Sequence, residues 1–286
     1  MTQDESAPVV WRAEGTDIGV AIMARGGKIA SLTGPDGHEW LAQAAGPIPV
    51  DPTPVFTDAE MCGWDECAPT ITPCRQDGID YPDHGELWAN PWELVESDAT
   101  SCALAFTSPR GDYRLERRAS VTGSTLAITY CVTALGRPIY WFWTSHPQFA
   151  VGEGAFITWA GQGAPIADTD QAGAPLKPWD PDFARIGTLP QHGSRKFYLN
   201  PAEFVASAQI HDDGRVLQMS WNKGLPYLGF WMERSRFART DIIALEPSVA
   251  YYDDLSLAVG LGTAPLLPPG RPYFWDVKVC FEGVSS

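Results

Sequence analysis

Apolar and polar residues alternate along most of the chain, with the period of two that is typical of strands with one buried face. The alternation is clearest between residues 113 and 132, on both sides of a turn at Gly123. Because residues i and i+2 of a strand point to the same side of a sheet, this segment predicts a β-hairpin. The residues that share its buried face are Tyr113, Leu115, Arg117, Ala119, Val121, Leu126, Ile128, Tyr130 and Val132.

Other segments repeat this pattern. A second hairpin is predicted, with one arm over Lys28–Thr33 and the other over Glu39–Leu41. None of the alternating segments carries the apolar stripe of an amphipathic helix. Many short strands separated by Gly, Pro and Asp turns predict an all-β fold, a sandwich or barrel. The further predicted strands are Ser101–Thr107, Ile139–Thr144, Val216–Trp221, Tyr227–Glu233, Ile242–Glu246 and Tyr273–Phe281.

We expect a single domain over residues 1–286, since no repeat, linker or abrupt change of composition divides the chain. Residues 1–10 are expected to form a flexible N-terminal tail. Two stretches lack a strand pattern, Gly46–Thr57 with four prolines and Gly161–Thr188. Loops of this length in a compact domain often form lids or binding walls. For the second stretch an excursion without function is an equally good interpretation.

The net charge of the chain limits the classes of partner that we expect it to bind. With 20 basic and 35 acidic residues the net charge is -15, and the basic residues are scattered. Nucleic acids and anionic membranes are bound by clustered Lys and Arg, so neither is an expected partner. The first residues lack a cationic segment followed by an apolar one, so we expect a cytoplasmic protein, as a monomer or homodimer.

Cys62, Cys67 and Cys74 are spaced C-x4-C-x6-C, without the C-x2-C pairs of a structural zinc site. We expect them to be free thiols.

Polar side chains concentrate in the segment Pro82–Trp88. If this segment is extended, His84, Glu86 and Trp88 point to one face, which would be costly in a core and suits the wall of a site. Imidazole and carboxylate groups are also metal ligands. A metal site remains an open alternative, with Asp65, Glu66, His84 and Glu86 as its ligands.

Two predicted strands end in a titratable residue followed by proline, His146-Pro147 and Glu246-Pro247. Proline cannot continue a central ladder, so these side chains lie where a strand meets a cavity or solvent.

Many of the twelve tryptophans fall near predicted turns or polar clusters, where an indole can stack on the C–H face of a sugar ring. These are Trp40, Trp64, Trp88, Trp92, Trp141, Trp143, Trp179, Trp221 and Trp231.

Together, these segments resemble the aldose 1-epimerases of the galactose mutarotase superfamily. Gly26–Leu32 followed by Glu39–Leu41 is similar to the N-terminal hairpin of that family. Asp83-His84-Gly85 resembles its first histidine motif, and His146-Pro147 with Phe149 its second. Residues 244–247 resemble the strand that carries the family's glutamate. The resemblance covers roughly residues 26–281 and implies a large antiparallel β-supersandwich with a cleft for a pyranose.

The resemblance also implies a reaction, the interconversion of sugar anomers without metal or organic cofactor. Glu246 would take the proton of the anomeric hydroxyl, His146 would protonate the ring oxygen, and His84 would bind the sugar from the other side of the cleft. A partly buried carboxyl and an imidazole can supply such a pair of proton-transfer groups. The expected substrate-binding residues are Trp64, Asp65, Glu66, Glu86, Trp88 and Trp221.

The chain departs from the glucose 6-phosphate branch of the family, which carries arginines after its first histidine. Glu86 follows here and would repel a phosphate. We therefore expect an uncharged or modified monosaccharide as substrate. For an acidic sugar the candidate contacts are Arg118, Arg185, Arg195 and Lys196, although structural roles are the simpler interpretation of each.

Two other functions remain open on the same fold. The first is a non-catalytic sugar-binding protein, because a fold does not determine a function. The second is a metal-dependent lyase, isomerase or glycoside-cleaving enzyme that uses the four ligands named above.

Overall fold

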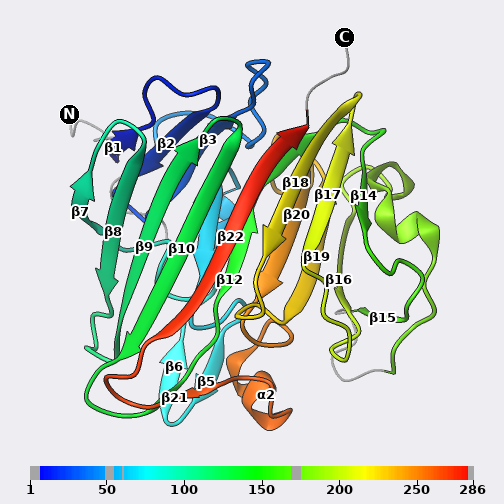
Figure 1. The fold of residues 1–286 in the computed structure, drawn as a ribbon. Coiled ribbons are helices and arrows are strands. Elements are labelled where there is room, and N and C mark those ends of the chain that lie inside the picture. Colours follow the sequence, from blue (N-terminus) through cyan, green and yellow to red (C-terminus); the bar gives the residue numbers. More distant parts are fainter. Residues whose placement is uncertain (1–6, 49–54, 60, 169–174, 283–286) are drawn as a thin grey trace.

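A computed structural model describes residues 7–48, 55–59, 61–168 and 175–282. Within these residues two antiparallel β-sheets stack face to face and enclose most of the hydrophobic core (Figure 1). The predicted all-β sandwich is confirmed.

The first sheet has ten strands in the described part of the chain, nine in one row and β13 (Phe149–Val151) paired with β20 beside it. Along the row they are β1 (Val9–Arg12), β2 (Gly19–Met23), β3 (Ile29–Thr33), β4 (Trp64–Cys67), β12 (Thr144–Pro147), β20 (Asp241–Ser248), β19 (Tyr227–Arg234), β16 (Ser194–Leu199) and β15 (Ile166–Asp168).

The second sheet has eight strands, which lie in front in Figure 1. In order across the sheet they are β14 (Phe156–Trp159), β17 (Ser207–Asp212), β18 (Arg215–Trp221), β22 (Tyr273–Glu282), β10 (Thr125–Ala134), β9 (Tyr113–Thr122), β8 (Ser101–Thr107) and β7 (Glu93–Ser97).

The remaining elements are short. Two strand pairs lie outside the main sheets, and the helices have three to six residues. None of the helices in the described ranges has the length and apolar character needed to span a membrane. The elements are β5 (Cys74–Gln76) with β6 (Ile79–Tyr81), β11 (Ile139–Tyr140) with β21 (Leu266–Leu267), α1 (Phe56–Ala59), α2 (Leu255–Gly260), η2 (Pro181–Ala184) and η3 (Ile186–Thr188).

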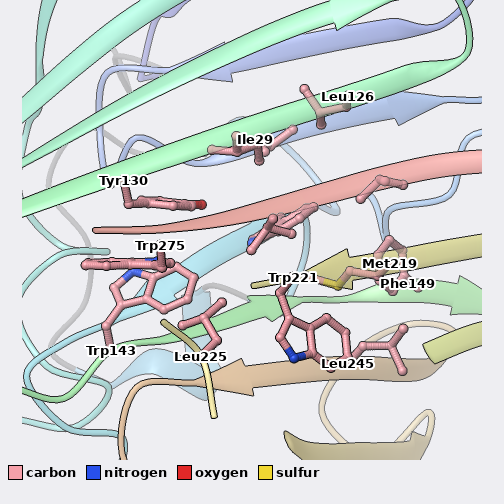
Figure 2. Packing of buried hydrophobic residues seen from close by; sticks show 14 of the residues in the cluster. Ile29, Leu126, Tyr130, Trp143, Phe149, Met219, Trp221, Leu225, Leu245 and Trp275 are labelled. Carbon is pink, nitrogen blue, oxygen red and sulfur yellow. The ribbon is translucent and has the colours of Figure 1, made fainter. Parts of the chain in front are cut away.

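Aromatic side chains from both sheets fill the space between them (Figure 2). The ring of Tyr130 on β10 stacks on Trp275 of β22, with centroids 5.2 Å apart, and Trp143 contacts both rings. Such pairs add to the free energy gained by burying large apolar surfaces. The apolar face that the period-two pattern predicts for the strands therefore lies between the two sheets.

Two predicted segments differ from the structure. The strand predicted over Ile139–Thr144 is divided into β11 and β12, because the amide of Trp141 donates to the carbonyl of Pro265 and the chain passes from one sheet to another. In the hairpin predicted over residues 28–41, the second arm makes single bridges only, from Glu39 to Thr33 and from Leu41 to Phe149.

The prediction of a flexible tail over residues 1–10 is wrong for residues 7–10. Residues 1–6 lie outside the described residues, but Val9 and Val10 belong to β1. Ala7 is buried, and its amide donates to the carbonyl of Ile48 at 2.7 Å.

Candidate active site

A cavity of about 210 Å³ lies on the face of the first sheet that points away from the second sheet. Leu245 of β20 and Phe197 of β16 belong to the core between the sheets, so their neighbours Glu246 and Lys196 point to the opposite face. This volume is below the range of about 300–1,000 Å³ that is usual for drug-sized ligands, and suits one small ring. The titratable side chains that line it are His84, His146, Lys196 and Asp253.

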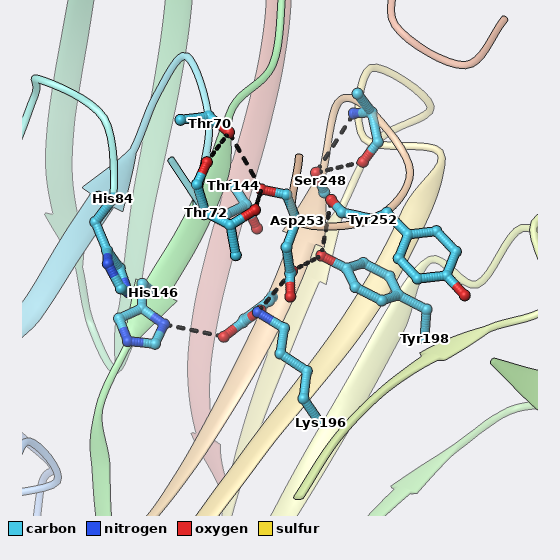
Figure 3. A network of polar contacts seen from close by, with 12 residues as sticks. Thr70, Thr72, His84, Thr144, His146, Lys196, Tyr198, Ser248, Tyr252 and Asp253 are labelled. Carbon is cyan, nitrogen blue, oxygen red and sulfur yellow. Dashed lines mark hydrogen bonds and ion pairs between the residues drawn. The ribbon is translucent and has the colours of Figure 1, made fainter. Parts of the chain in front are cut away.

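Glu246 lies beneath this lining, fully buried on β20. Its Oε1 accepts a hydrogen bond of 2.9 Å from Nδ1 of His146, and its Oε2 lies 2.6 Å from Nζ of Lys196 (Figure 3). Because a carboxylate only accepts hydrogen bonds, the proton of this pair is on Nδ1.

Lys196 joins Glu246 to a second carboxylate. Its Nζ lies 2.9 Å from Oδ1 of Asp253, which also accepts a hydrogen bond of 2.8 Å from the hydroxyl of Tyr198. The ring of Tyr198 passes over Gly229, where a Cβ atom would lie 2.8 Å from the ring. Gly229 is the register partner of Glu246, so glycine at this position lets the network form.

The carbonyl of Asp253 fixes this residue to the loop after β4. It accepts the amides of Ile71 and Thr72 at 2.9 and 2.8 Å. The position of the Asp253 carboxylate is thus set by backbone contacts that do not depend on a ligand.

His84 stands in a turn beside His146. His84 and Gly85 both have positive φ, 57° and 70°, and a Cβ atom at Gly85 would lie 2.0 Å from the carbonyl oxygen of Ala68. The imidazole stacks on the ring of Phe56, with centroids 3.9 Å apart, and its centroid lies 5.7 Å from that of His146. The two histidines therefore face one cavity.

Charges and burial set the protonation of these groups. Burial raises the pKa of Glu246, but Lys196 and the hydrogen bond from His146 outweigh it and lower the pKa to about 2. Burial lowers the pKa of His84, and the nearby His146 adds to this effect, while Asp83 opposes it. At neutral pH the site holds a carboxylate at Glu246 and a neutral imidazole at His84.

The lowered pKa of Glu246 predicts an acid-dependent stability. A carboxyl group whose pKa is lower in the folded than in the unfolded protein stabilises the fold above its ordinary pKa, and this contribution is lost as the pH falls toward the folded value. Glu246 should thus contribute about 3 kcal/mol to the free energy of unfolding at neutral pH, most of it lost between pH 5 and pH 2. Denaturant unfolding of wild type and Glu246→Gln across this range measures the difference, and a difference that does not change with pH would contradict the prediction.

The structure brings the three predicted catalytic residues, His84, His146 and Glu246, to one place. The condition under which His84, Glu86 and Trp88 would share one face, an extended segment over residues 82–88, is not met, because the positive φ values of His84 and Gly85 turn the chain. The residues that flank His84 therefore do not share its face.

Three of the predicted substrate-binding residues point between the sheets. Trp64 and Trp221 belong to the hydrophobic core. Glu66 is buried there too, where Oε1 accepts hydrogen bonds from Arg117 and Tyr130 at 2.6 and 2.9 Å. The prediction that they line the pocket is wrong.

The other three lie near the cavity but are outside its lining. Asp65 is buried in an ion pair with Lys28, and Glu86 lies 3.1 Å from Arg110. Trp88 packs edge-on against Phe56 and so supports the ring that stacks on His84. These residues can influence the site only through their neighbours.

The four alternative metal ligands do not form one cluster. The carboxylates of Asp65, Glu66 and Glu86 face three different basic residues, and His84 stands apart from them. Across the described ranges, no group of three or more His, Cys, Asp or Glu side chains is arranged to hold a metal ion.

Sequence reasoning missed Phe56 and Asp253, and it named Lys196 only as a contact for an acidic sugar. Phe56 and Thr57, which line the cavity, come from the proline-rich stretch predicted to form a wall, and residues 49–54 of that stretch lie outside the described residues. Asp253 follows two tyrosines and carries no motif of its own.

The second long stretch, residues 161–188, lies at the edge of the sandwich in its described part. Residues 169–174 lie outside the described residues. In the described part, Trp179 and Phe183 pack on Phe197, a residue of the core between the sheets. This part covers the edge of the sandwich and not the cavity.

Solved structures share the fold over nearly the whole chain. A protein from Synechocystis sp. PCC 6803 matches with a TM-score of 0.76 and 15% identity, covering 99% of this chain and 98% of that chain. A galactose mutarotase related enzyme from Lactobacillus acidophilus matches with a TM-score of 0.71 and 12% identity over 96% and 98% of the two chains. A galactose mutarotase-like protein from Lactobacillus casei gives 0.69 and 17% over 95% and 99%. At these identities the matches establish the galactose mutarotase-like fold.

A search of curated proteins finds no match. The sequence profile of the family described as aldose 1-epimerase matches residues 10–254, a range that contains the four titratable residues of the cavity lining and Glu246. The chain belongs to the aldose 1-epimerase family.

Proposed function

We propose that this protein is an isomerase that interconverts the α and β anomers of an uncharged free monosaccharide. The observation that carries the proposal is the contact of His146 and Glu246 at the wall of a ring-sized cavity, with the imidazole of His84 beside that of His146. Mutarotation needs one group to take a proton from the anomeric hydroxyl and another to give a proton to the ring oxygen. A carboxylate and an imidazole side by side suit these two roles.

In the proposed reaction the sugar replaces the hydrogen bond between His146 and Glu246. Glu246 takes the proton of the anomeric hydroxyl, and protonated His146 gives a proton to the ring oxygen. The bond from C1 to the ring oxygen breaks as the C1 carbonyl forms. After C1 rotates, the ring closes on the other face of the carbonyl, and both protons return to the groups that held them.

The low pKa of Glu246 belongs to the state in which His146 is bound to it. An anomeric hydroxyl in place of His146 removes one of the contacts that lower this pKa, so the carboxylate becomes a better base when the sugar enters. Lys196 keeps its contact with Oε2 and holds the carboxylate in place.

Exchange NMR on equilibrated anomer mixtures tests the proposal. The protein should accelerate exchange between the α and β signals of at least one uncharged aldose above the uncatalysed rate. Ligand-observed NMR on the same samples reports binding. A sugar that binds without accelerated exchange would show a binding protein and overturn the proposal.

A further inference from the structure

The side chain of Lys196 reaches Glu246 diagonally across the sheet. In the strand register, Glu246 of β20 pairs with Gly229 of β19, and Gly229 pairs with Tyr198 of β16. Lys196 lies two residues from Tyr198 on β16, a separation of about 7 Å along the strand. A lysine side chain has many rotamers, so the contact with Glu246 alone would hold Nζ only loosely. A second contact restricts where the ammonium can lie.

Asp253 supplies this second contact from a position that the backbone fixes. Its Oδ1 lies 2.9 Å from Nζ of Lys196 and accepts a hydrogen bond from the hydroxyl of Tyr198 (Figure 3). Two hydroxyls and two amides donate to its carbonyl. The preceding residue, Tyr252, has a φ of 74°, which is unfavourable for a bulky side chain. Strained backbone of this kind is typical of functional sites, where the surrounding contacts maintain it.

Two carboxylates share the ammonium of Lys196. Its Nζ lies 2.6 Å from Oε2 of Glu246 as well as against Asp253, and among the described lining residues Lys196 is the one Lys or Arg. Burial lowers the pKa of Lys196, but Asp253 and Glu246 together outweigh burial and raise this pKa, so the group stays charged. The arginines considered for an acidic sugar lie outside this lining; they are Arg118, Arg185 and Arg195.

The other titratable groups beside Glu246 are neutral or take part in the proposed reaction. Cys67 of β4 and Tyr198 of β16 both have a raised pKa, first because of burial and then because of carboxylates that include Glu246. They therefore remain a thiol and a phenol. His146 of β12 is the proposed acid. In the described part of the chain, the remaining charges in contact with Glu246, directly or through one nitrogen, are those of the ammonium and of Asp253.

We propose that Asp253 is a positioning residue for the base Glu246: it holds the ammonium of Lys196 against Oε2 and takes a share of its charge, which leaves Oε1 able to accept a proton. An ammonium paired with Glu246 alone would stabilise the carboxylate more and make it a weaker base. Without any ammonium, the buried carboxyl would tend to stay protonated. This inference rests on the proposed function and adds to it a residue that acts without touching the sugar.

Asp253→Asn tests the charge of Asp253 while keeping its shape. The amide oxygen can still accept from both Lys196 and Tyr198, so the variant should fold. By exchange NMR, kcat should fall by up to about 10-fold with KM nearly unchanged, because a weaker base destabilises the transition state. Loss of the neighbouring negative charge lowers the pKa of Glu246, so the acid limb of the kcat profile should move to lower pH by about one unit.

Lys196→Met should move the same limb in the opposite direction, to higher pH, because the carboxyl of Glu246 loses its cation. Adding Asp253→Asn to Lys196→Met should cause little further loss of kcat, since Asp253 acts through Lys196. A merely structural role of Asp253 would lower kcat without moving the acid limb.

The matched control is the neighbouring residue, in the variant Asp254→Asn. The carboxylate of Asp254 caps α2 by accepting the amide of Leu257, and asparagine is an equally good cap. Asp254 is outside the described lining of the cavity, so this variant should keep the wild-type kcat and the wild-type pH profile.

The outcomes separate this inference from the function on which it rests. Unchanged exchange in Asp253→Asn, an unmoved acid limb, or losses that multiply in the double variant would overturn the role of Asp253 and leave the epimerase function standing. A higher KM at unchanged kcat would do the same and would show that Asp253 binds the sugar. Accelerated exchange of no sugar by the wild-type protein would overturn both.

Discussion

Glu246→Gln is expected to lower kcat for anomer exchange by about 10²- to 10⁴-fold, the usual contribution of a positioned proton-transfer group. Glutamine has nearly the shape of glutamate and can still accept a hydrogen bond from Lys196, but it cannot hold the proton of the anomeric hydroxyl. KM should change much less than kcat, because the lost interaction belongs to the transition state. Exchange NMR over a range of sugar concentrations gives both constants.

His146→Ala should cause a loss of similar size, since the two groups act in one step. The double variant should be little worse than either single variant, as expected for residues that work as a unit. Losses that multiply would show that the two groups act independently.

Controls come from the second sheet, away from the cavity. His211→Ala on β17 and Glu116→Gln on β9 remove an imidazole and a carboxylate at positions outside the lining. Both should keep the wild-type kcat. An active Glu246→Gln variant that binds sugar with wild-type affinity would exclude this carboxylate as the base.

The sequence predicts the architecture well because a period of two reports which face of a strand is buried. Ser101–Thr107 was predicted to the residue, and the strands over 216–221, 227–233 and 273–281 agree within about two residues. The pattern fails where the chain changes sheets, as at Trp141, because side chains on both sides of the chain are buried there. It is also silent for strands of three or four residues, which are too short to show a period.

The sequence predicts only part of the candidate site, because a period of two does not show where a side chain points when both faces of a strand are buried. His146 and Glu246 stand out because each follows an apolar segment and precedes a proline. The predicted strand ends are wrong, since β12 includes Pro147 and β20 continues through Pro247 to Ser248. Polar residues in the segment 64–67 also stand out, but all four positions of β4 are buried, so neither composition nor period tells which face each side chain takes. Glu66 pairs across the core with Arg117, a partner 51 residues away that no local pattern reveals.

That ion pair between the sheets predicts a large effect on stability. Arg117 is fully buried, donates to Glu66 at 2.6 Å and to the carbonyl of Gly27, and lies 5.1 Å from the ring centre of Trp92. Arg117→Met keeps much of the side-chain volume but leaves the carboxylate of Glu66 in the core without a cation. The free energy of unfolding should fall by about 3–5 kcal/mol, the cost of breaking a buried ion pair from one side. Denaturant unfolding measures this change.

The neighbouring arginine supplies the matched control. Arg118 pairs with Glu96 on the outer face of the same sheet, where both side chains are about half exposed, so Arg118→Met should cost less than about 1 kcal/mol. The double variant Glu66→Gln/Arg117→Met should recover part of the loss, because it removes the unpaired charge. The amide oxygen can take the place of Oε2 and accept from Trp143, and the amide NH2 can donate to the hydroxyl of Tyr130. A different result would be that Arg117→Met lowers the free energy of unfolding no more than Arg118→Met does. In that case Glu66 either takes up a proton in the core or is reached by water, and the burial of Glu66 does not depend on the positive charge of Arg117.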